Sequence, residues 1–250
     1  VPAIRYTLSK RLGPIMKTIL KPSGEDSFWK DAVRDLVVVV VGILAALWLE
    51  SWWQDQLDRR EEKQILASLK TEFQANQEQM KDRLATWEFG RNRVADLHAL
   101  MGGPVNDQTI AEFESFYSRG MSNGGNFFFD PRQGQLTSVI NSGKLGLINN
   151  PALRSLIADW PALIADHDFD QKLWIQMYSG PFGQIEMQYV QSWPESRFEY
   201  PTGELMQNPM YDNALEGIFG ILGLMILEGN EIVEATNAIM AMIDDELGDV

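Results

Sequence analysis

The side chains whose types and spacing suit acid–base or metal chemistry gather around His167, one of two histidines in the sequence. His167 lies in "DHDFDQK", where Asp166, Asp168 and Asp170 match the first three ligand positions of a calcium-binding loop. Such a loop needs glycine at its sixth position and glutamate at its twelfth, but this chain has glutamine and methionine there. An EF-hand is therefore excluded. The stretch is interpreted as a solvated acidic helix face, with an improvised cation site as the alternative.

The rest of the sequence offers no recognised catalytic arrangement. His98 has no acidic or hydroxyl neighbours in a known pattern, so we expect a surface or packing role for it. The sequence lacks a G-x-S-x-G elbow, a P-loop, a dinucleotide fingerprint and H-E-x-x-H. It also lacks cysteine, which excludes thiolate nucleophiles, disulfides and iron–sulfur clusters. We expect no enzymatic activity, no cofactor and no metal site.

Charge is distributed unevenly along the chain, whose formal net charge is -14. Residues 1–53 hold seven Lys/Arg and five Asp/Glu, so the remaining 197 residues carry a net charge of -16. Phosphate backbones repel so acidic a body, which argues against nucleic-acid binding. The start of the chain is instead a basic arm that suits an anionic membrane surface. Its cations are Arg5, Lys10, Arg11, Lys17 and Lys21.

Residues 36–49 form an apolar run of fourteen residues. As a helix this run measures about 21 Å, which is shorter than the ~30 Å hydrocarbon layer of a bilayer. It is apolar on every side and has aromatic belts at both ends, and these features predict a transmembrane anchor over residues 28–53. The alternative is a buried core helix of a soluble protein. The belts supply the candidate membrane-interface residues, which are Phe28, Trp29, Trp48, Trp52 and Trp53.

The distribution of basic residues also predicts the topology of this anchor. The positive-inside rule places residues 1–27, a basic amphipathic segment, in the cytoplasm of a bacterium and residues 54–250 in its periplasm. No small-residue cleavage pattern follows the run, so we expect an uncleaved anchor in the inner membrane. Gly42 and Ala46 form a small-x-x-x-small pair that lets a second helix approach closely. The ordinary abundance of both residues in membrane spans is the alternative.

Residues 54–250 are predicted to form an acidic helical bundle built on one long helix, so the expected fold class is mainly α. Apolar residues repeat every seven positions from Leu66 to Met101, but the companion seam is polar at Asn76 and Arg83. A clean dimeric coiled coil is therefore excluded, and the helix should pack against other helices of the same chain.

Local signals place the remaining helices. Thr109 is followed by a glutamate three residues later, which predicts that Thr109 is an N-cap. Gly143 is predicted to end a helix in the left-handed conformation, and Asn150 is predicted to be a second N-cap. The run at 217–227 is too short to span a bilayer and is predicted to be core, with glycines at 217, 220 and 223 allowing close packing. Further helices are expected at 162–178, 182–192 and 211–246.

Two segments resemble a bacterial family of single-span membrane proteins of unknown function. "VVVVVGILAALWLESWWQ" is similar to that family's V-x-G-I-L-x-A-L run with its Trp-containing polar turn. "SVINSGKLGLINNPALRSLIADW" is similar to its S-G-x-L-x-L-I-x-N-x-x-L-R segment, and "IMAMIDDEL" to its carboxyl-terminal helix. The resemblance implies an amino-terminal anchor followed by a helical domain, and it implies no activity.

From these observations we expect a non-catalytic, membrane-anchored accessory or stabilising subunit of a larger inner-membrane complex, for example a photosynthetic or respiratory one. Its expected partners are the lipid bilayer and other membrane subunits, and a homo-oligomer remains open. The alternative is a free-standing periplasmic sensor or ligand-binding domain. That function requires a pocket lined by the aromatic residues at 127–129 and 174–200.

Overall fold

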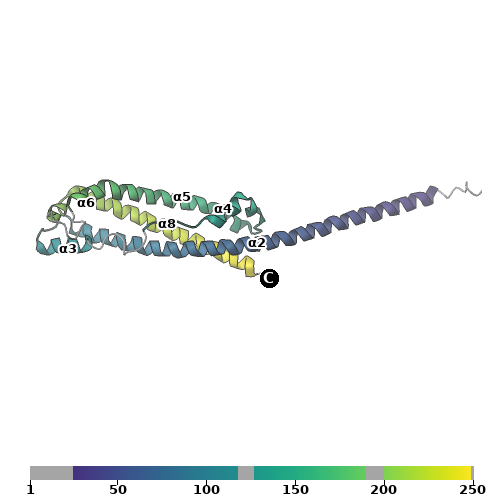
Figure 1. Cartoon of the computed structure of the whole chain (residues 1–250), viewed down its shortest axis with the longest axis horizontal. Coiled ribbons are helices and arrows are strands. Elements are labelled where there is room, and N and C mark those ends of the chain that lie inside the picture. Colours follow the sequence, from purple (N-terminus) through teal and green to yellow (C-terminus); the bar gives the residue numbers. More distant parts are fainter. Residues whose placement is uncertain (1–24, 118–126, 190–199, 249–250) are drawn as a thin grey trace, which may run out of the picture. The chain divides into compact units, whose positions relative to one another are not determined.

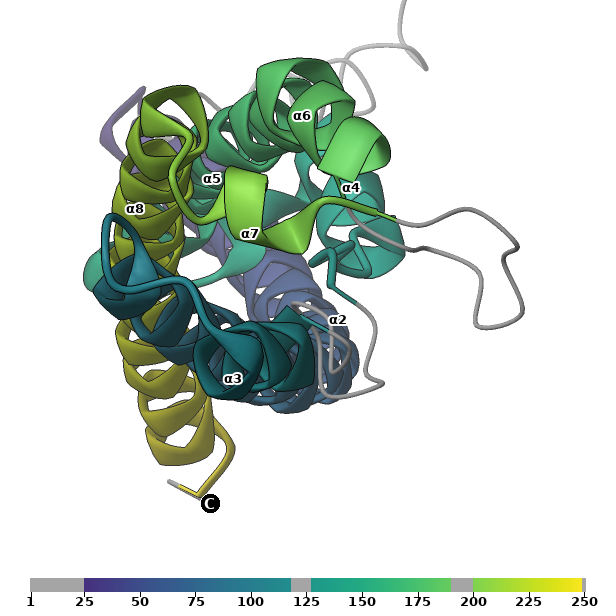
Figure 2. The same ribbon diagram turned by 90° about the vertical axis from the view of Figure 1, so that its left-hand side faces the viewer.

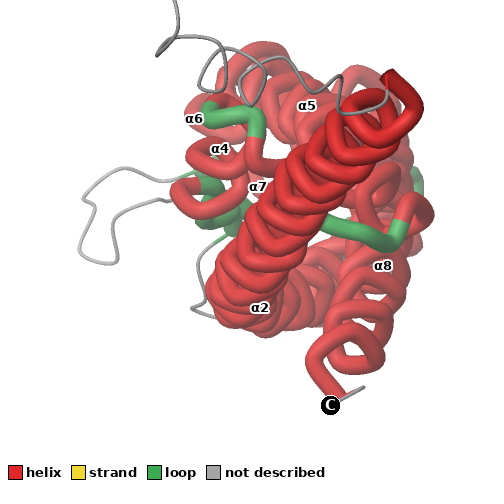
Figure 3. The backbone as a smooth tube through the Cα atoms, turned by 90° about the vertical axis from the view of Figure 1, so that its right-hand side faces the viewer, coloured by secondary structure: helices red, strands yellow, loops and turns green. Residues whose placement is uncertain are grey.

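The computed structural model describes residues 25–117, 127–189 and 200–248, and these ranges contain helices and connecting segments without a strand (Figure 3). The mainly α prediction is therefore confirmed. The side chains of residues 25–28, 117 and 181 lie outside this description. The elements are α2 (Glu25–Leu100), α3 (Asp107–Tyr117), α4 (Gly134–Asn141), η1 (Lys144–Leu147), α5 (Pro151–Met177), η2 (Tyr178–Phe182), α6 (Gly183–Tyr189), α7 (Thr202–Leu205) and α8 (Pro209–Gly248).

The chain divides into two compact units, Val1–Asp58 and Arg59–Val250, and α2 contributes to both. The described part of the first unit is the amino-terminal stretch of α2. The second unit is a bundle of the remaining stretch of α2 with α5 and α8, and α3, α6 and α7 lie at one end of it (Figures 1 and 2).

The core of the bundle forms where the apolar stripes of its three long helices meet. The predicted seven-residue repeat of α2 supplies one stripe, and its members from Leu66 to Val94 are almost completely buried. Gly90 and Asn76 of the companion seam are also buried. The prediction that α2 packs within its own chain is therefore confirmed. The largest fully buried side chains include Phe73, Met80, Trp87, Phe113, Trp160, Phe182 and Tyr211.

Polar pairs show that α8 runs antiparallel to α2. The pairs are Lys70 with Asp244, Gln77 with Asn237, and His98 with Asp212. Each step forward along α2 is matched by a similar step backward along α8. Between these pairs the helices come close at Gly229, where a Cβ atom would lie 2.8 Å from Leu84 and 3.1 Å from Trp87. Glycine at this position allows the two helices to approach.

Helix α8 is also antiparallel to α5. His167 contacts Glu228, and the place of a Cβ on Gly217 lies 2.6 Å from the methyl group of Met177. Helices α2 and α5 are therefore parallel, so the chain must travel back along the bundle between them. It does so in the segment 127–133, which we call the return segment.

The return segment is nearly fully extended. Its first contact with α2 joins Phe127 to Trp87, and a later contact joins Arg132 to Asn76. The five steps from Phe127 to Arg132 cover about 16 Å in an extended chain, and the eleven steps from Asn76 to Trp87 also rise about 16 Å in a helix. An extended strip of chain thus runs along the bundle and contacts both α2 and α5.

The local signals were correct at some helix ends and wrong at others. Asn150 caps α5 by accepting hydrogen bonds from the N–H groups of Ala152 and Leu153, and Gly143 has a φ of 73°, as expected. Thr109 is not an N-cap, because α3 begins earlier and Thr109 exchanges hydrogen bonds with Asn106, which takes that role.

Two expectations about helix interiors need correction. Helix α5 continues through Pro161 instead of restarting after it, since a single missing N–H is tolerated in a long packed helix. Within 217–227 the core prediction is confirmed for its inward face, but Leu224 and Leu227 are exposed. Of the three glycines predicted to allow close packing, Gly220 has nothing within 4 Å of its Cβ position.

Candidate functional site

The apolar segment, residues 36–49, is exposed along its whole length in the first unit. Every described side chain from Trp29 to Asp55 is exposed, including Leu44 at 59%. The most apolar 18-residue stretch of this helix has a mean hydropathy of 2.3, and none of it is buried. The described chain thus contains one helix long and apolar enough to cross a membrane.

The predicted membrane-interface residues lie at or just beyond the two ends of this segment. Trp29 is 67% exposed, and Trp48, Trp52 and Trp53 are also exposed. Phe28 lies in α2, but its side chain is outside the described residues. Gly42 has nothing within 4 Å of its Cβ position, and Ala46 is exposed, so this face is free to accept another helix. The basic arm (Arg5, Lys10, Arg11, Lys17 and Lys21) lies outside the described residues.

The acidic stretch around His167 is only partly a solvated helix face. Successive residues of a helix point about 100° apart, so aspartates two residues apart face different ways. Asp166 is exposed, Asp168 pairs with Lys172, and Asp170 is buried at 8% exposure. Among the described residues, no group of three or more His, Asp and Glu side chains is placed to hold a metal ion.

His167 forms the centre of a buried polar cluster between α5 and α8. Its side chain is 1% exposed, and its Nδ1 lies 3.1 Å from Oε2 of Glu228. Asp170, three residues further along α5, is also buried. Trp87 of α2 packs against the imidazole, with ring centroids 5.2 Å apart. The cluster thus joins two helices through ionisable groups beneath an aromatic cover.

Burial shifts the pKa values of His167 and Glu228 in opposite directions, and each shift favours the neutral form of the side chain. Desolvation lowers the pKa of His167 from 6.5 to about 4, against the opposing pull of Asp168 and Asp166. Desolvation, together with the charge and the hydrogen bond of Asp170, raises the pKa of Glu228 from 4.5 to about 7. A neutral imidazole with its hydrogen on Nδ1 donates to Glu228 and leaves Nε2 bare. This tautomer fits the absence of a hydrogen-bond partner at Nε2 among the described residues.

Side chains of α2 and α5 hold the return segment in place. The amide of Asn76 donates to the carbonyl of Arg132 and accepts from its N–H, both at 2.8 Å. The amide of Gln171 makes the same pair of bonds with Phe129, at 2.7 and 3.1 Å. A side-chain amide carries the same donor and acceptor as a peptide group. These two side chains therefore satisfy backbone groups of the return segment that pair with no neighbouring strand among the described residues.

Carboxylates of α2 anchor the chain that follows the return segment. Glu72 accepts from the N–H groups of Gln135 and Leu136, at the amino end of α4. A negative charge is favourable there because helix amino ends carry unpaired N–H donors. Glu62, 6% exposed, accepts from the N–H and the side-chain amide of Asn149. Long-range polar contacts thus position the second segment of the family resemblance.

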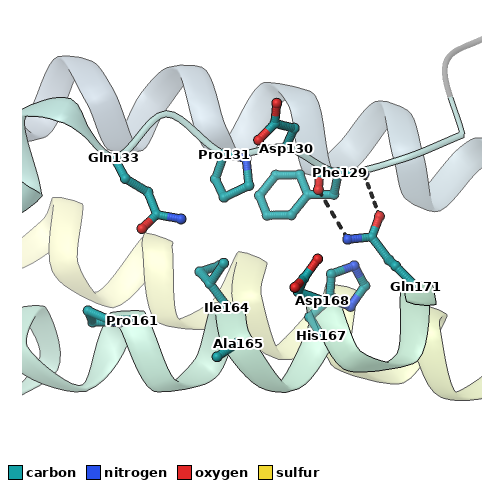
Figure 4. Close-up of a pocket in the computed structure, with 10 residues that line it drawn as sticks. All are labelled: Phe129, Asp130, Pro131, Gln133, Pro161, Ile164, Ala165, His167, Asp168 and Gln171. Atoms are coloured by element: carbon teal, nitrogen blue, oxygen red, sulfur yellow. Dashed lines mark hydrogen bonds between the residues drawn. The ribbon is translucent and has the colours of Figure 1, made fainter. Parts of the chain in front are cut away.

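A cleft of about 260 Å³ lies between the return segment and α5 (Figure 4). Figure 4 shows Phe129 and Pro131 above Ile164 and His167, with Gln171 bonded across to the backbone of Phe129. Asp130, Gln133 and Asp168 add polar groups, and Pro161 and Ala165 complete the lining. The cleft has the mixed apolar and polar lining of a small-molecule site, but it is slightly below the ~300–1,000 Å³ usual for such sites.

The aromatic residues expected to line a ligand pocket pack against each other instead. Phe127 stacks on Trp174 with ring centroids 4.0 Å apart, and Trp174 stacks on Tyr178 at 4.8 Å. The stack continues through Phe182 to Tyr211. Of the described aromatics in this set, only Phe129 lines the cleft. The part of the expected pocket at 190–199 lies outside the described residues.

Sequence reasoning missed most of the residues that build this site. Glu228, Gln171 and Glu62 are not adjacent in sequence to their partners, and no short motif marks them. Besides the conspicuous His167, the sequence signalled Asn76, because a buried amide in an apolar seam requires a hydrogen-bonding partner.

Comparison with known proteins gives one match. Residues 35–166 match the model of a family described as "Family of unknown function (DUF6090)". The matched stretch contains the apolar segment, the return segment and the first part of α5. The expected resemblance to an uncharacterised family is confirmed to this extent. No curated protein and no solved structure matches the chain.

Proposed function

The chain belongs to this family of unknown function, and on that premise we propose that it is a non-catalytic accessory subunit that stabilises a larger complex in a bacterial inner membrane. The observation that carries the proposal is the uncovered apolar segment. Removing so many adjacent apolar side chains from water is strongly favourable, and lipid or the helices of other membrane subunits can cover them.

The proposed topology follows from charge. The basic arm remains in the cytoplasm and the acidic bundle lies in the periplasm, as the positive-inside rule predicts. Arg34 pairs with Asp31 and Asp35 near the cytoplasmic end of the apolar segment, which lowers the penalty of placing charges close to the hydrocarbon layer. Trp29 and Trp52 then lie near the two membrane interfaces.

The surface of the bundle supports a role in protein contacts. Several large apolar side chains are exposed on it, and aromatic residues and methionine are enriched at protein interfaces. The most exposed are Phe169, Met187, Met210 and Leu227. The polar groups of the described bundle that resemble catalytic ones are engaged in holding helices and the return segment together, which supports a structural role.

The first test is recovery of the tagged full chain from native membranes in a mild detergent, followed by mass spectrometry. We expect a defined set of membrane subunits at fixed stoichiometry. Recovery of the chain alone, or only with a second copy of itself, would overturn the accessory-subunit proposal. Gly42→Leu should reduce recovery of the partners if Gly42 and Ala46 contact a partner helix, whereas the matched control Val40→Leu should not.

The absence of cysteine makes topology simple to test, because any introduced cysteine is the sole thiol. Asp31→Cys and Glu234→Cys place one thiol on each side of the proposed membrane at exposed positions. A membrane-impermeant maleimide should label the second in spheroplasts, and the first only after permeabilisation. The reverse pattern would overturn the orientation, and labelling of both would overturn the span.

A second function, a ligand-binding periplasmic domain, is favoured only by the cleft beside α5. This function predicts that the chain is recovered without partners and that a small molecule raises its unfolding temperature. Ala165→Trp would fill the cleft from an exposed position and should then abolish the temperature rise.

A further inference from the structure

We propose that the cleft between the return segment and α5 binds a small organic ammonium ion, that is, a protonated amine with a compact apolar body. The inference rests on the second function above, the ligand-binding cleft, and names the class of its ligand. It does not depend on the accessory-subunit proposal, since a subunit of a complex can also hold a small ligand. Its basis is the arrangement of His167, Asp168 and Phe129 around the cleft (Figure 4).

The first observation is a nitrogen of His167 that lacks a partner. The side chain is 1% exposed, and its Nδ1 lies 3.1 Å from Oε2 of Glu228 on α8. The two nitrogens of an imidazole point in widely different directions, so Nε2 points away from this contact. Figure 4 shows the imidazole directed from α5 toward the return segment, where it lines the cleft.

This nitrogen sets the hydrogen-bonding character of the ligand. Nε2 has no hydrogen-bond partner among the described residues, although buried polar atoms are normally paired. When Nδ1 donates its hydrogen to Glu228, Nε2 of the neutral ring is bare and can only accept. A molecule that completes this site must therefore carry an N–H or O–H donor.

The charge of the lining favours a donor that is positively charged. Asp130 and Asp168 line the cleft, and none of its described lining residues is Lys or Arg. Lys172 lies outside the lining and pairs with Oδ2 of Asp168, but a carboxylate can accept from several donors at once. The net charge of -16 on residues 54–250 also raises the local concentration of cations.

The same lining favours an organic cation over a metal ion. The described residues contain no group of three or more His, Asp and Glu side chains placed to hold a metal, whereas an ammonium ion needs only a few hydrogen-bond acceptors. Phe129, Pro131 and Ile164 supply apolar contacts for a carbon body, and an aromatic ring also attracts cations. The volume of about 260 Å³ limits the ligand to a small one. An organic ion thus fits the improvised cation site left open by the sequence.

Titration calorimetry of the full chain in detergent, near neutral pH and at low salt, tests the proposal. The probes are benzylamine and benzyl alcohol, which have similar shapes and differ in charge. Benzylamine should bind saturably, one molecule per chain, and at least about tenfold more tightly than the alcohol. Added salt should weaken the binding of the amine, because it screens the attraction between charges.

Three variants locate the bound amine. Asp168→Asn removes the charge from a half-exposed side chain and should weaken binding about tenfold. Asp159→Asn, an exposed change on α5 outside the lining, is the matched control and should bind as the wild type does. Ala165→Trp fills the cleft from an exposed position and should abolish binding without unfolding the bundle. Unchanged affinity in Asp168→Asn or Ala165→Trp would overturn the proposal.

Nitrogen NMR supplies a readout at His167 itself. His98 is the other histidine of the chain, so His98→Gln leaves one imidazole to observe. In the free protein Nε2 should resonate as an unprotonated nitrogen, and its resonance should move when benzylamine is added. A protonated Nε2 in the free protein, or a resonance that does not move when the amine binds, would overturn the proposal.

The two probes also separate the failure of this inference from the failure of the function on which it rests. Equal affinity for benzylamine and benzyl alcohol would overturn the ammonium assignment and retain the cleft as a ligand site. Binding of neither probe would overturn the assignment and leave the second function without support. The accessory-subunit proposal is tested separately, by recovery of the chain with its partners.

Discussion

The two units of this chain use the same helix, α2, in opposite ways. In the first unit no polar or charged residue interrupts positions 36 to 49, and all of these residues are exposed. In the second unit apolar side chains recur every three or four residues and are buried against α5 and α8. A continuous run suits surroundings that are apolar on every side, whereas a periodic stripe suits a core on one side only. The spacing of apolar residues therefore identifies the surroundings that each stretch of helix requires.

The largest expected effect comes from placing the same charge in both units. Leu69→Arg buries an unpaired cation in the core and should lower the free energy of unfolding by more than about 4 kcal/mol, which abolishes the folded bundle. Leu44→Arg should leave the bundle folded but weaken membrane insertion by roughly 3 kcal/mol. Circular dichroism measures the first effect, and alkaline extraction of membranes measures the second. The contrast between the two units would be wrong if both substitutions unfolded the bundle, or if both weakened only membrane insertion.

Tryptophan removal gives the next largest effect. Trp87 is completely buried and donates its indole N–H to the carbonyl of Phe127 at 2.8 Å. Trp87→Ala should lower the free energy of unfolding by about 3–5 kcal/mol, because a large cavity and an unpaired carbonyl remain. Trp48, at 69% exposure, is the matched control. Trp48→Ala should change the free energy of unfolding by less than about 0.5 kcal/mol. Urea unfolding in detergent measures both, and a similar loss in the two variants would contradict the contrast.

Loss of the Asn76 amide tests how the return segment is held. Asn76→Ala should lower the free energy of unfolding by about 1–3 kcal/mol, because it leaves both backbone groups of Arg132 without partners. Asn230, exposed on α8, donates to the carbonyl of Ile226 within the same helix, so Asn230→Ala serves as the control. Thermal unfolding should separate the two variants clearly. Equal melting temperatures would mean that the return segment does not depend on this amide.

A smaller effect is expected from the glycines of α8. Gly229→Ala places a methyl group against Leu84 and Trp87, and we expect a loss of about 1–2 kcal/mol. Gly220→Ala meets nothing within 4 Å and should raise stability by about 0.5–1 kcal/mol through helix propensity. Opposite changes in melting temperature would confirm that the close approach lies at Gly229. Changes of the same sign would contradict it.

The smallest effect expected in the wild type is the dependence of its stability on pH, because the shifts of two groups offset each other and only single variants reveal them. Between pH 4.5 and 6.5 the unfolded chain holds a proton on His167, whereas the folded chain holds one on Glu228 instead. The number of protons bound is then the same in both states, and this pair contributes no slope. In His167→Gln only the raised pKa of Glu228 remains, so stability should fall as pH rises from 4.5 to 7. In Glu228→Gln only the lowered pKa of His167 remains, so stability should rise between pH 4 and 6.5.

These opposite slopes are measured as urea midpoints at several pH values. Slopes of the same sign in the two variants would mean that the proton does not move from the imidazole to the carboxyl group on folding. Glu234→Gln, an exposed change, should follow the wild type throughout.

The sequence by itself determined the helical class, the exposed apolar segment and the inward stripe of α2, because each depends on the periodicity of neighbouring residues. It also determined the cap at Asn150 and the left-handed glycine at 143, since these depend on single residues and their local backbone. Only the tertiary structure decided that α5 continues through Pro161, because packing against α8 compensates for one missing hydrogen bond.

The site required the fold for a similar reason. His167 was conspicuous in the sequence, but its partner Glu228 lies 61 residues away on another helix. Asn76 and Gln171 hydrogen-bond to the backbone of the return segment only because α2 and α5 are parallel and the chain must return between them. Local pattern determines which residues are helical, whereas burial and long-range pairing determine which polar residues change their protonation and which hold the backbone.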